Sequence, residues 1–221
     1  MSVSDNLKAL RSDIPEGVRL VAVSKFHPVE ALMQAYAEGQ RLFGESRAAE
    51  LCDKAAVMPS DVEWHFIGHL QTNKVRQIIP HVAMIHSVDS VRLLQLIDSE
   101  ARRAGRVVPV LIQLHVALEE TKFGFTPGEA LSAITPALAG SLPNVRVAGV
   151  MGMASNVDDT ARIQADFRLI HDTWARLRES LGNPDGFDTV SMGMSHDWPL
   201  AVSEGANMIR VGTTIFGERE Y

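Results

Sequence analysis

The segment RLVAVSKFHPVEALMQAYAE, residues 19–38, contains the unit from which the whole chain is built. Its first part, Arg19–Ser24, is a short apolar run typical of a buried strand. In the second part, Pro28–Glu38, apolar residues recur at helical spacing, and Pro28 suits the first turn of a helix. The segment therefore predicts a strand followed by a helix.

The same alternation recurs along the rest of the chain. A helix between two strands returns the chain for a parallel pairing, and further helices are expected at Val91–Ala104 and Asp158–Ser180. Asp158 and Asp159 would lie at the favourable end of the latter helix dipole. The expected strands are Arg19–Ser24, Arg41–Gly44, Glu63–Gly68, Met84–Val88, Val108–Val116, Val145–Met151, Thr189–Met192 and Met208–Val211.

The spacing of these strands favours one barrel over two domains. They follow one another at intervals of roughly 20 to 30 residues, and no Pro/Gly/Ser-rich linker divides the chain. A length of 221 residues is within the range of one α/β barrel. We therefore expect an α/β fold, a single-domain (β/α)8 TIM barrel over residues 1–221.

Composition excludes several classes of protein. The net charge of -6 argues against recognition of a phosphate backbone, which needs clustered Lys and Arg, so we expect no nucleic-acid partner. No apolar run is long enough to cross a bilayer, and residues 1–17 carry both charge signs without the apolar stretch of a secretory signal. A single cysteine, Cys52, expected in a helix and in the core, forms no internal disulfide and suits a reducing compartment. These observations predict a cytoplasmic protein that does not bind membranes.

The carboxyl ends of the expected strands carry residues suited to binding. In a parallel barrel these ends form the functional face, and Lys25 follows the first strand there. The seventh strand runs into Ser191–Asp197, and the eighth carries Arg210–Thr214. Small residues let backbone N–H groups approach an anion, hydroxyls add donors, and barrel enzymes often hold phosphate with these two loops. The pattern predicts a phosphate site.

Taken separately, these signals have ordinary explanations. Glycine serves any tight turn, and a lysine at a strand end is often only solvated. Together they form the arrangement needed to hold a phosphorylated aldehyde by an imine and a phosphate, and pyridoxal 5'-phosphate (PLP) fits that description. Because Lys25 attacks only as the neutral amine, we expect burial and the neighbouring cation Arg210 to lower its pKa.

Several longer motifs resemble those of one known family. They are VSK, FGE, WHFIGHLQTNK, HSVD, the E-x-x-K-x-G of Glu119 to Gly124, SMGMSHD and RVGTTIFGERE, in collinear order from Val18 to Tyr221. The chain resembles the pyridoxal phosphate homeostasis protein family, also called the YggS or PROSC type. The resemblance implies a fold-type III PLP-binding barrel, similar to the N-terminal domain of alanine racemase.

The resemblance also implies the cofactor contacts. PLP would form a Schiff base with Lys25, while Ser195 and the backbone of Gly212 and Thr213 would take the phosphate. Arg210 would face the pyridine nitrogen, and Met194 would help to close the pocket. Ser46 would be a further contact, although it stands where the family often has Asn, so it keeps a hydroxyl and lacks the paired donor and acceptor of an amide. His115 also replaces an Asn, and adds a ring that either titrates beside the cofactor face or is packed and neutral.

The surroundings of the cofactor bear on catalysis. An arginine at the ring nitrogen donates a hydrogen bond without protonating the ring, which weakly supports carbanion chemistry. Alanine racemase adds a C-terminal β-domain and a tyrosine acid/base from a partner subunit, whereas here only Ile215–Tyr221 follow Thr214, and the two tyrosines are Tyr36 and Tyr221. We therefore expect that the protein has no catalytic residue and that it binds PLP without robust turnover.

The function expected is PLP (vitamin B6) homeostasis, by a monomeric cytosolic carrier or regulator that supplies PLP to apoenzymes. The alternative is a PLP-dependent amino-acid racemase of low activity. A third possibility is a barrel enzyme that acts on a phosphorylated sugar and keeps only the phosphate site.

Other motifs do not support a different chemistry. His65 and His69 would align as zinc ligands on a helix, but in a strand their offset spans roughly 13 Å, so we expect no metal site. The consecutive residues Ser195, His196 and Asp197 cannot form a hydrolase relay, and no G-x-S-x-G elbow surrounds the serine. Neither a P-loop nor a Rossmann glycine motif is present.

Overall fold

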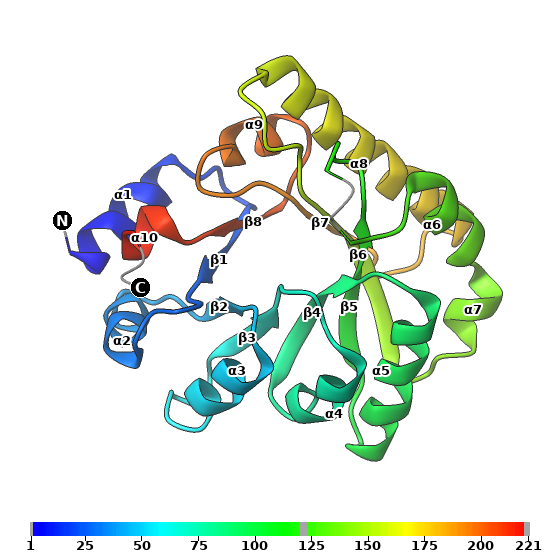
Figure 1. The fold of residues 1–221 in the computed structure, drawn as a ribbon, viewed down its shortest axis with the longest axis horizontal. Helices are drawn as coiled ribbons and strands as arrows, with labels where there is room; N and C mark the ends of the chain where they lie inside the picture. The colour runs from blue at the N-terminus through cyan, green and yellow to red at the C-terminus, as the bar shows by residue number, and fades with distance from the viewer. Residues whose placement is uncertain (1, 120–122, 219–221) are drawn as a thin grey trace.

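The protein folds as a closed barrel of eight parallel strands in sequence order, seen in a computed structural model that describes residues 2–119 and 123–218 (Figure 1). Each strand pairs with the next, and β1 pairs with β8 to close the ring. The predicted fold class is therefore confirmed. The strands are β1 Arg19–Val23, β2 Leu42–Glu45, β3 Glu63–Phe66, β4 Val82–Val88, β5 Val108–Leu114, β6 Val145–Gly152, β7 Thr189–Ser191 and β8 Met208–Val211.

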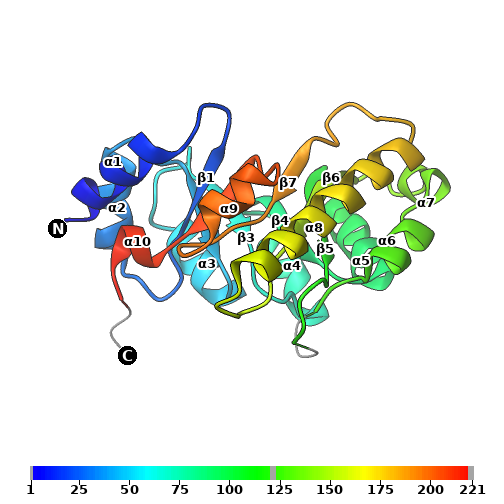
Figure 2. The same ribbon diagram turned by 90° about the horizontal axis from the view of Figure 1, so that it is seen from above.

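Helices connect the strands and cover the outside of the barrel (Figures 1 and 2). The three predicted helices are present, with Pro28 as the N-cap of α2 and Asp159 as the N-cap of α8. The helical segments are α1 Val3–Asp13, α2 Val29–Ala37, α3 Ala48–Ala55, the 3-10 turn η1 Thr72–Lys74, α4 Val75–Ile78, α5 Val91–Arg103, α6 Pro127–Ala133, α7 Pro136–Gly140, α8 Thr160–Ser180, α9 Trp198–Ser203 and α10 Thr213–Phe216.

Alternation along each strand divides the core into two parts. On β1, Val21 belongs to a small cluster inside the barrel, whereas Leu20 and Ala22 belong to the large cluster between barrel and helices. Successive strand residues face opposite sides of the sheet, which explains this division. The inner cluster consists of Val21, Met84, Leu111, Ala148, Met151 and Met208. Toward the carboxyl ends of the strands the interior also contains buried polar residues, among them Ser191 and Arg210.

The two ends of the described chain meet at the closure of the barrel. Ala22 of β1 lies opposite Val211 of β8, and α1 lies beside α10 in both views (Figures 1 and 2). Asn6 Nδ2 donates a hydrogen bond to the Ile215 carbonyl at 3.1 Å. As a result, the loops that follow the first and last strands lie next to each other.

The structure corrects the expectation for Cys52, and it does not describe every residue of the quoted motifs. Cys52 lies in α3 as predicted, but it is half-buried rather than part of the core, with its Sγ 3.4 Å from the Gln77 carbonyl at the contact with α4. Lys122 of the E-x-x-K-x-G motif and the terminal Tyr221 lie outside the described residues. Within residues 2–119 and 123–218, none of the helices has the length and apolar character needed to traverse a bilayer.

Candidate functional site

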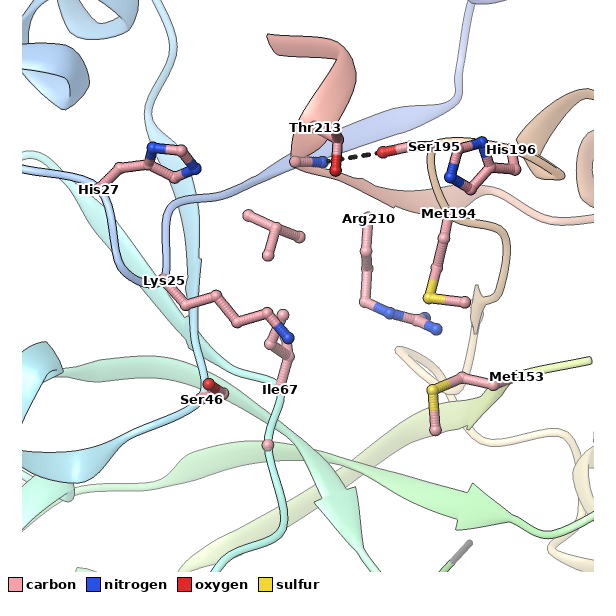
Figure 3. Close-up of a pocket in the computed structure, with 13 residues that line it drawn as sticks. Lys25, His27, Ser46, Ile67, Met153, Met194, Ser195, His196, Arg210 and Thr213 are labelled. Atoms are coloured by element: carbon pink, nitrogen blue, oxygen red, sulfur yellow. Dashed lines mark hydrogen bonds between the residues drawn. The ribbon is translucent and has the colours of Figure 1, made fainter. Parts of the chain in front are cut away.

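A pocket of ≈ 250 Å³ lies at the carboxyl ends of the strands (Figure 3). Its residues come from the loops after β1, β2, β3, β6, β7 and β8 and from the ends of β1 and β8. They are Val23, Lys25, His27, Ser46, Ile67, Gly68, Met153, Met194, Ser195, His196, Arg210, Gly212 and Thr213. The set combines one amine, one guanidinium, several hydroxyls and apolar side chains.

All seven residues predicted to bind the cofactor line this pocket: Lys25, Ser46, Met194, Ser195, Arg210, Gly212 and Thr213. The structure thus brings together side chains that are up to 188 positions apart, from Lys25 to Thr213. Their role as cofactor contacts stays a prediction.

Lys25 lies in a tight turn that follows β1. The backbone N–H of His27 donates to the Ser24 carbonyl at 3.1 Å, which closes the turn around Lys25 and Phe26. Figure 3 shows the Lys25 side chain extending into the space between Ser46 and Ile67 on one side and Arg210 on the other. Its amine is therefore directed into the pocket, as a nucleophile there must be.

The loops after β7 and β8 form the opposite wall. The backbone N–H of Gly212 donates to Ser195 Oγ at 3.3 Å (Figure 3), and the N–H of Met194 donates to Asp197 Oδ1 at 2.6 Å. A Cβ on Gly212 would lie 3.0 Å from the Val23 carbonyl oxygen, so glycine suits this close approach of the chain after β8 to the end of β1. The wall exposes hydroxyls and backbone N–H groups, which are suitable donors to an anion.

Arg210 is a buried cation at the floor of the pocket. Its side chain donates from Nη1 to Ser191 Oγ at 2.6 Å and from Nη2 to the Gly152 carbonyl at 3.0 Å. Burial lowers the pKa of Arg210 to about 10, which still leaves the guanidinium charged at neutral pH. Two fixed hydrogen bonds hold the group in one orientation.

A chain of polar side chains continues from Arg210 into the barrel. His86 Nδ1 lies 3.2 Å from Ser191 Oγ, and His86 Nε2 lies 2.7 Å from His65 Nδ1. Burial lowers the pKa of His65 to about 3, and burial with the nearby His65 and Arg210 lowers the pKa of His86 well below 6.5. Both rings are therefore neutral at physiological pH.

Sequence reasoning missed several residues of the pocket. Val23, Ile67 and Met153 supply apolar walls, and His27 and His196 add two imidazoles. The His27 ring stacks on Phe216 with centroids 4.9 Å apart. Val23 could have been found from strand alternation with Val21, whereas the loop residues gave no periodic signal.

The other histidines named from the sequence have separate partners. His65 pairs with His86, while His69 lies 3.0 Å from Asp89 Oδ2 and stacks on Phe123. His115 is half-buried, with Nε2 3.1 Å from the Ala117 carbonyl, and it does not line the pocket. Among residues 2–119 and 123–218, no three His, Cys, Asp or Glu side chains come together to hold a metal ion.

The serine, histidine and aspartate of SMGMSHD also do not act together. Ser195 Oγ accepts from Gly212, and Asp197 Oδ1 accepts from the Met194 backbone. No described hydrogen bond joins the three side chains.

The donor set of the pocket suits PLP. An aldehyde needs an amine, a phosphate needs hydroxyl and backbone N–H donors, and an aromatic ring needs apolar walls. Lys25 supplies the first, the Ser195 and Gly212 loops supply the second, and Ile67, Met153 and Val23 supply the third. The residues present therefore fit the cofactor that the sequence predicts.

The chain matches one family model and is similar to several pyridoxal phosphate homeostasis proteins. The family model described as "Alanine racemase, N-terminal domain" matches residues 2–220. The pyridoxal phosphate homeostasis protein of Pseudomonas aeruginosa is 41% identical over 210 residues, which are 94% of this chain and 87% of that protein. The human pyridoxal phosphate homeostasis protein is 37% identical over 213 residues, 92% of this chain and 77% of that protein.

Solved structures share the fold. PipY of Synechococcus elongatus PCC7942, with PLP bound, matches with a TM-score of 0.89 and 39% identity, covering 98% of this chain and 100% of that one. An alanine racemase of Clostridium difficile 630 matches with a TM-score of 0.80 and covers 100% of this chain and 57% of that one. Its identity is only 16%, so this likeness shows the barrel alone.

Proposed function

This chain belongs to the pyridoxal phosphate homeostasis protein family, within the wider alanine racemase N-terminal domain family, and from that membership we propose that it binds PLP in the pocket at the barrel mouth and takes part in PLP homeostasis. One observation carries the proposal: Lys25 and the Ser195 and Gly212 loops line the same pocket. The amine and the anion donors thus converge on one small ligand.

Each residue has a distinct task in this proposal. Lys25, as the neutral amine, bonds to the aldehyde carbon of PLP with loss of water. Ser195, Gly212 and Thr213 hold the phosphate, and Arg210 donates to the pyridine nitrogen. Ser46 and Met194 contact the ring side of the pocket and limit access of water.

Binding without robust turnover is the better description of the activity. PLP supplies an electron sink when bound, and that sink is strongest when a carboxylate keeps the ring nitrogen protonated. Arg210 is a cation and can only donate, so it leaves the ring neutral. Tyr36 is no substitute for an acid/base, because it donates to Asp61 before β3, at the other end of the barrel.

Borohydride reduction tests the binding proposal. The purified protein with added PLP is expected to turn yellow, and borohydride followed by peptide mapping is expected to locate the reduced cofactor on Lys25. Lys25→Ala should lose the label, whereas Lys74→Ala, which removes a half-exposed amine on the η1 turn, should keep it. A colourless wild-type protein that takes up no PLP would reject the proposal, and would leave a phosphorylated-sugar enzyme as the better reading.

The cellular part of the proposal is delivery of PLP to apoenzymes by a monomer in the cytoplasm. An open pocket mouth, with Met194 and Thr213 exposed at its edge, supports exchange of the ligand. Loaded protein mixed with a PLP-dependent apoenzyme is expected to restore its activity faster than the cofactor dissociates into buffer. If the apoenzyme is activated no faster than PLP dissociates into buffer, direct delivery is rejected. Sedimentation velocity would measure the molecular mass in solution and test whether the protein is a monomer.

A second candidate is an amino-acid racemase of low activity. His27 and His196 favour it, because imidazoles at the pocket could serve as acid or base where a single lysine covers only one face. Incubation with single enantiomers of several amino acids would decide. Sustained inversion that is lost in His27→Gln or His196→Gln would support the racemase.

A further inference from the structure

The turn that carries Lys25 has an unusual backbone. Phe26 has a φ of 68°, and it shares positive φ with only Asn183 among the non-glycine residues that the structure describes. With the His27 to Ser24 hydrogen bond, Phe26 occupies the turn position that normally selects glycine or asparagine. A side chain at this position is strained, so the surroundings must hold the turn in place.

A buried cluster of charges lies directly against this turn. Lys54 of α3 donates to Glu45 Oε1 at 2.8 Å, to Glu50 Oε1 at 2.7 Å and to the Ser24 carbonyl at 2.8 Å. The side chains of Glu45 and Lys54 are 0% and 7% exposed, and Glu50 is 19% exposed. All three protons of the Lys54 amine are therefore used, one of them on the residue before Lys25.

The same cluster also holds the residue after Lys25. Glu50 Oε1 accepts from the backbone N–H of Phe26 at 2.5 Å, and Ser24 Oγ donates to Glu45 Oε1 at 2.6 Å. On the outside, the Arg47 guanidinium lies over the Phe26 ring, 4.5 Å from its centroid. Side chains from residues 45–54 thus contact both neighbours of Lys25 in the turn, Ser24 and Phe26.

We propose that Glu45, Glu50 and Lys54 are positioning residues for Lys25, which keep the strained turn in the conformation that directs the amine at the cofactor aldehyde. The proposal rests on the proposed function and adds to it. The three residues do not line the pocket, so they act only through the Ser24 and Phe26 backbone.

The cost of the cluster supports a role beyond packing. Buried ion pairs are rarely the best way to stabilise a fold, and apolar side chains of similar size often do as well. Glu45 Oε2 is also buried without a hydrogen-bond partner in the described structure. Burial of these charges costs free energy, and the cluster makes hydrogen bonds to Ser24 and Phe26. The need to hold the Lys25 turn in one conformation explains both observations.

Glu50→Ala is the sharpest test, because Glu50 is the least buried member of the cluster. The variant removes the acceptor of the Phe26 N–H, and it should slow covalent attachment of PLP by about tenfold or more. Its affinity for pyridoxine 5'-phosphate, which has the phosphate but no aldehyde, should stay within about twofold. Glu50→Gln keeps an acceptor oxygen and should recover most of the rate.

Glu204→Ala serves as the matched control. Glu204 is similarly buried, with 14% of its side chain exposed, and it pairs with Arg168 before β8, at the other end of the barrel. Attachment in this variant should equal that of the wild type. If Glu50→Ala attaches PLP at the wild-type rate, or loses both ligands equally, the positioning role is rejected.

Phe26→Gly tests the mechanism itself. Glycine reaches positive φ without strain, so adding Glu50→Ala to Phe26→Gly should change the attachment rate less than Glu50→Ala alone does. The double variant Glu45→Gln/Lys54→Met, which removes both buried charges together, should also slow attachment. Additive effects of Phe26→Gly and Glu50→Ala would contradict the proposal.

The proposed function and the positioning role of the cluster are refuted by different results. A wild-type protein without a borohydride-stable bond at Lys25 would refute the proposed function. A wild-type protein that forms the bond, with variants that form it equally fast, would refute only the positioning role.

Discussion

Arg210 can only donate hydrogen bonds, and this leads to a prediction for the tautomers of His86 and His65, which continue the polar chain below it. Arg210 donates to one lone pair of Ser191 Oγ, and we predict that the serine proton points to His86 Nδ1, which then accepts. His86 then carries its proton on Nε2 and donates it to His65 Nδ1, so His65 also carries its proton on Nε2. We predict these tautomers for both rings, to be read from nitrogen chemical shifts. A proton on Nδ1 of His86 would contradict the direction of the chain.

The neutral histidines also predict a pH dependence of stability. The pKa of His65 is about 3 in the folded state, and that of His86 is well below 6.5, whereas unfolded histidine has a pKa of 6.5. Below pH 6.5 the unfolded state thus binds more protons than the folded state. The free energy of unfolding should therefore decrease as the pH is lowered, by up to about 1.4 kcal/mol per pH unit for each ring. Urea unfolding between about pH 7 and pH 5 measures the slope.

His65→Leu/His86→Leu provides the comparison for this slope. Burial raises the pKa of Glu45, so that carboxyl takes up a proton in the folded state first and opposes the histidines. Glu45 is present in both proteins and its effect cancels. An unchanged slope in the double variant would show that the histidines do not cause it.

Gly212 gives a prediction for the phosphate side of the pocket. In Gly212→Ala the added Cβ would meet the Val23 carbonyl at 3.0 Å and the Val23 Cβ at 3.2 Å, so the backbone of Gly212 and its Val23 neighbour would have to move slightly apart. We expect about a tenfold loss of affinity for PLP and a smaller loss for pyridoxal, which has no phosphate. Gly128→Ala, where the Cβ meets nothing within 4 Å, should bind both as the wild type does.

At this scale the sequence predicts the ends of strands better than the residues that support them. Lys25 and Arg210 can be predicted from the sequence because a barrel places the carboxyl ends of its strands at one face. His27, Met153 and His196 belong to loops whose paths depend on tertiary packing, so no spacing reveals which of them turn inward. Glu50 and Lys54 form an i,i+4 pair on α3, but nothing in the sequence shows that Glu45 and the Lys25 turn meet this pair.

Among the elements, helix α8 tests how local chemistry sets a boundary. The Asp159 side chain accepts from the backbone N–H groups of Ala161 and Arg162, two donors without a partner in the helix. Asp159→Ala should lower the free energy of unfolding by about 1 kcal/mol. Asp158→Ala removes the same charge one residue earlier and should cost clearly less, as urea unfolding would show. Equal losses would mean that charge, and not capping, is responsible.

Strand boundaries show where sequence patterns lose information. The predicted strands at Glu63–Gly68 and Val108–Val116 end two residues earlier, at Phe66 and Leu114. His115 ends the β5 ladder because its N–H donates to the Phe125 carbonyl of the following loop. The apolar run continues past this point, but the backbone partner changes, and only the folded structure shows the change.

For the whole molecule, one closed barrel predicts one unfolding transition. A ring of strands has no seam at which half could unfold alone, so we propose a single domain, as expected for residues 1–221. Trp64 in β3 and Trp198 in α9 lie in different halves of the chain. Fluorescence of Trp→Phe variants that keep either reporter should give the same urea midpoint as circular dichroism. Two separate midpoints would show that the halves are independent.

The pairing of β1 with β8 also has a consequence for biosynthesis. Lys25 leaves the ribosome well before Arg210 and Gly212 do, and the pocket needs all three residues. A nascent chain halted before β8 has the Lys25 amine but lacks the pocket residues Arg210, Gly212 and Thr213. Capture of the ligand in the complete pocket therefore has to wait until β8 and the residues that follow it have been translated.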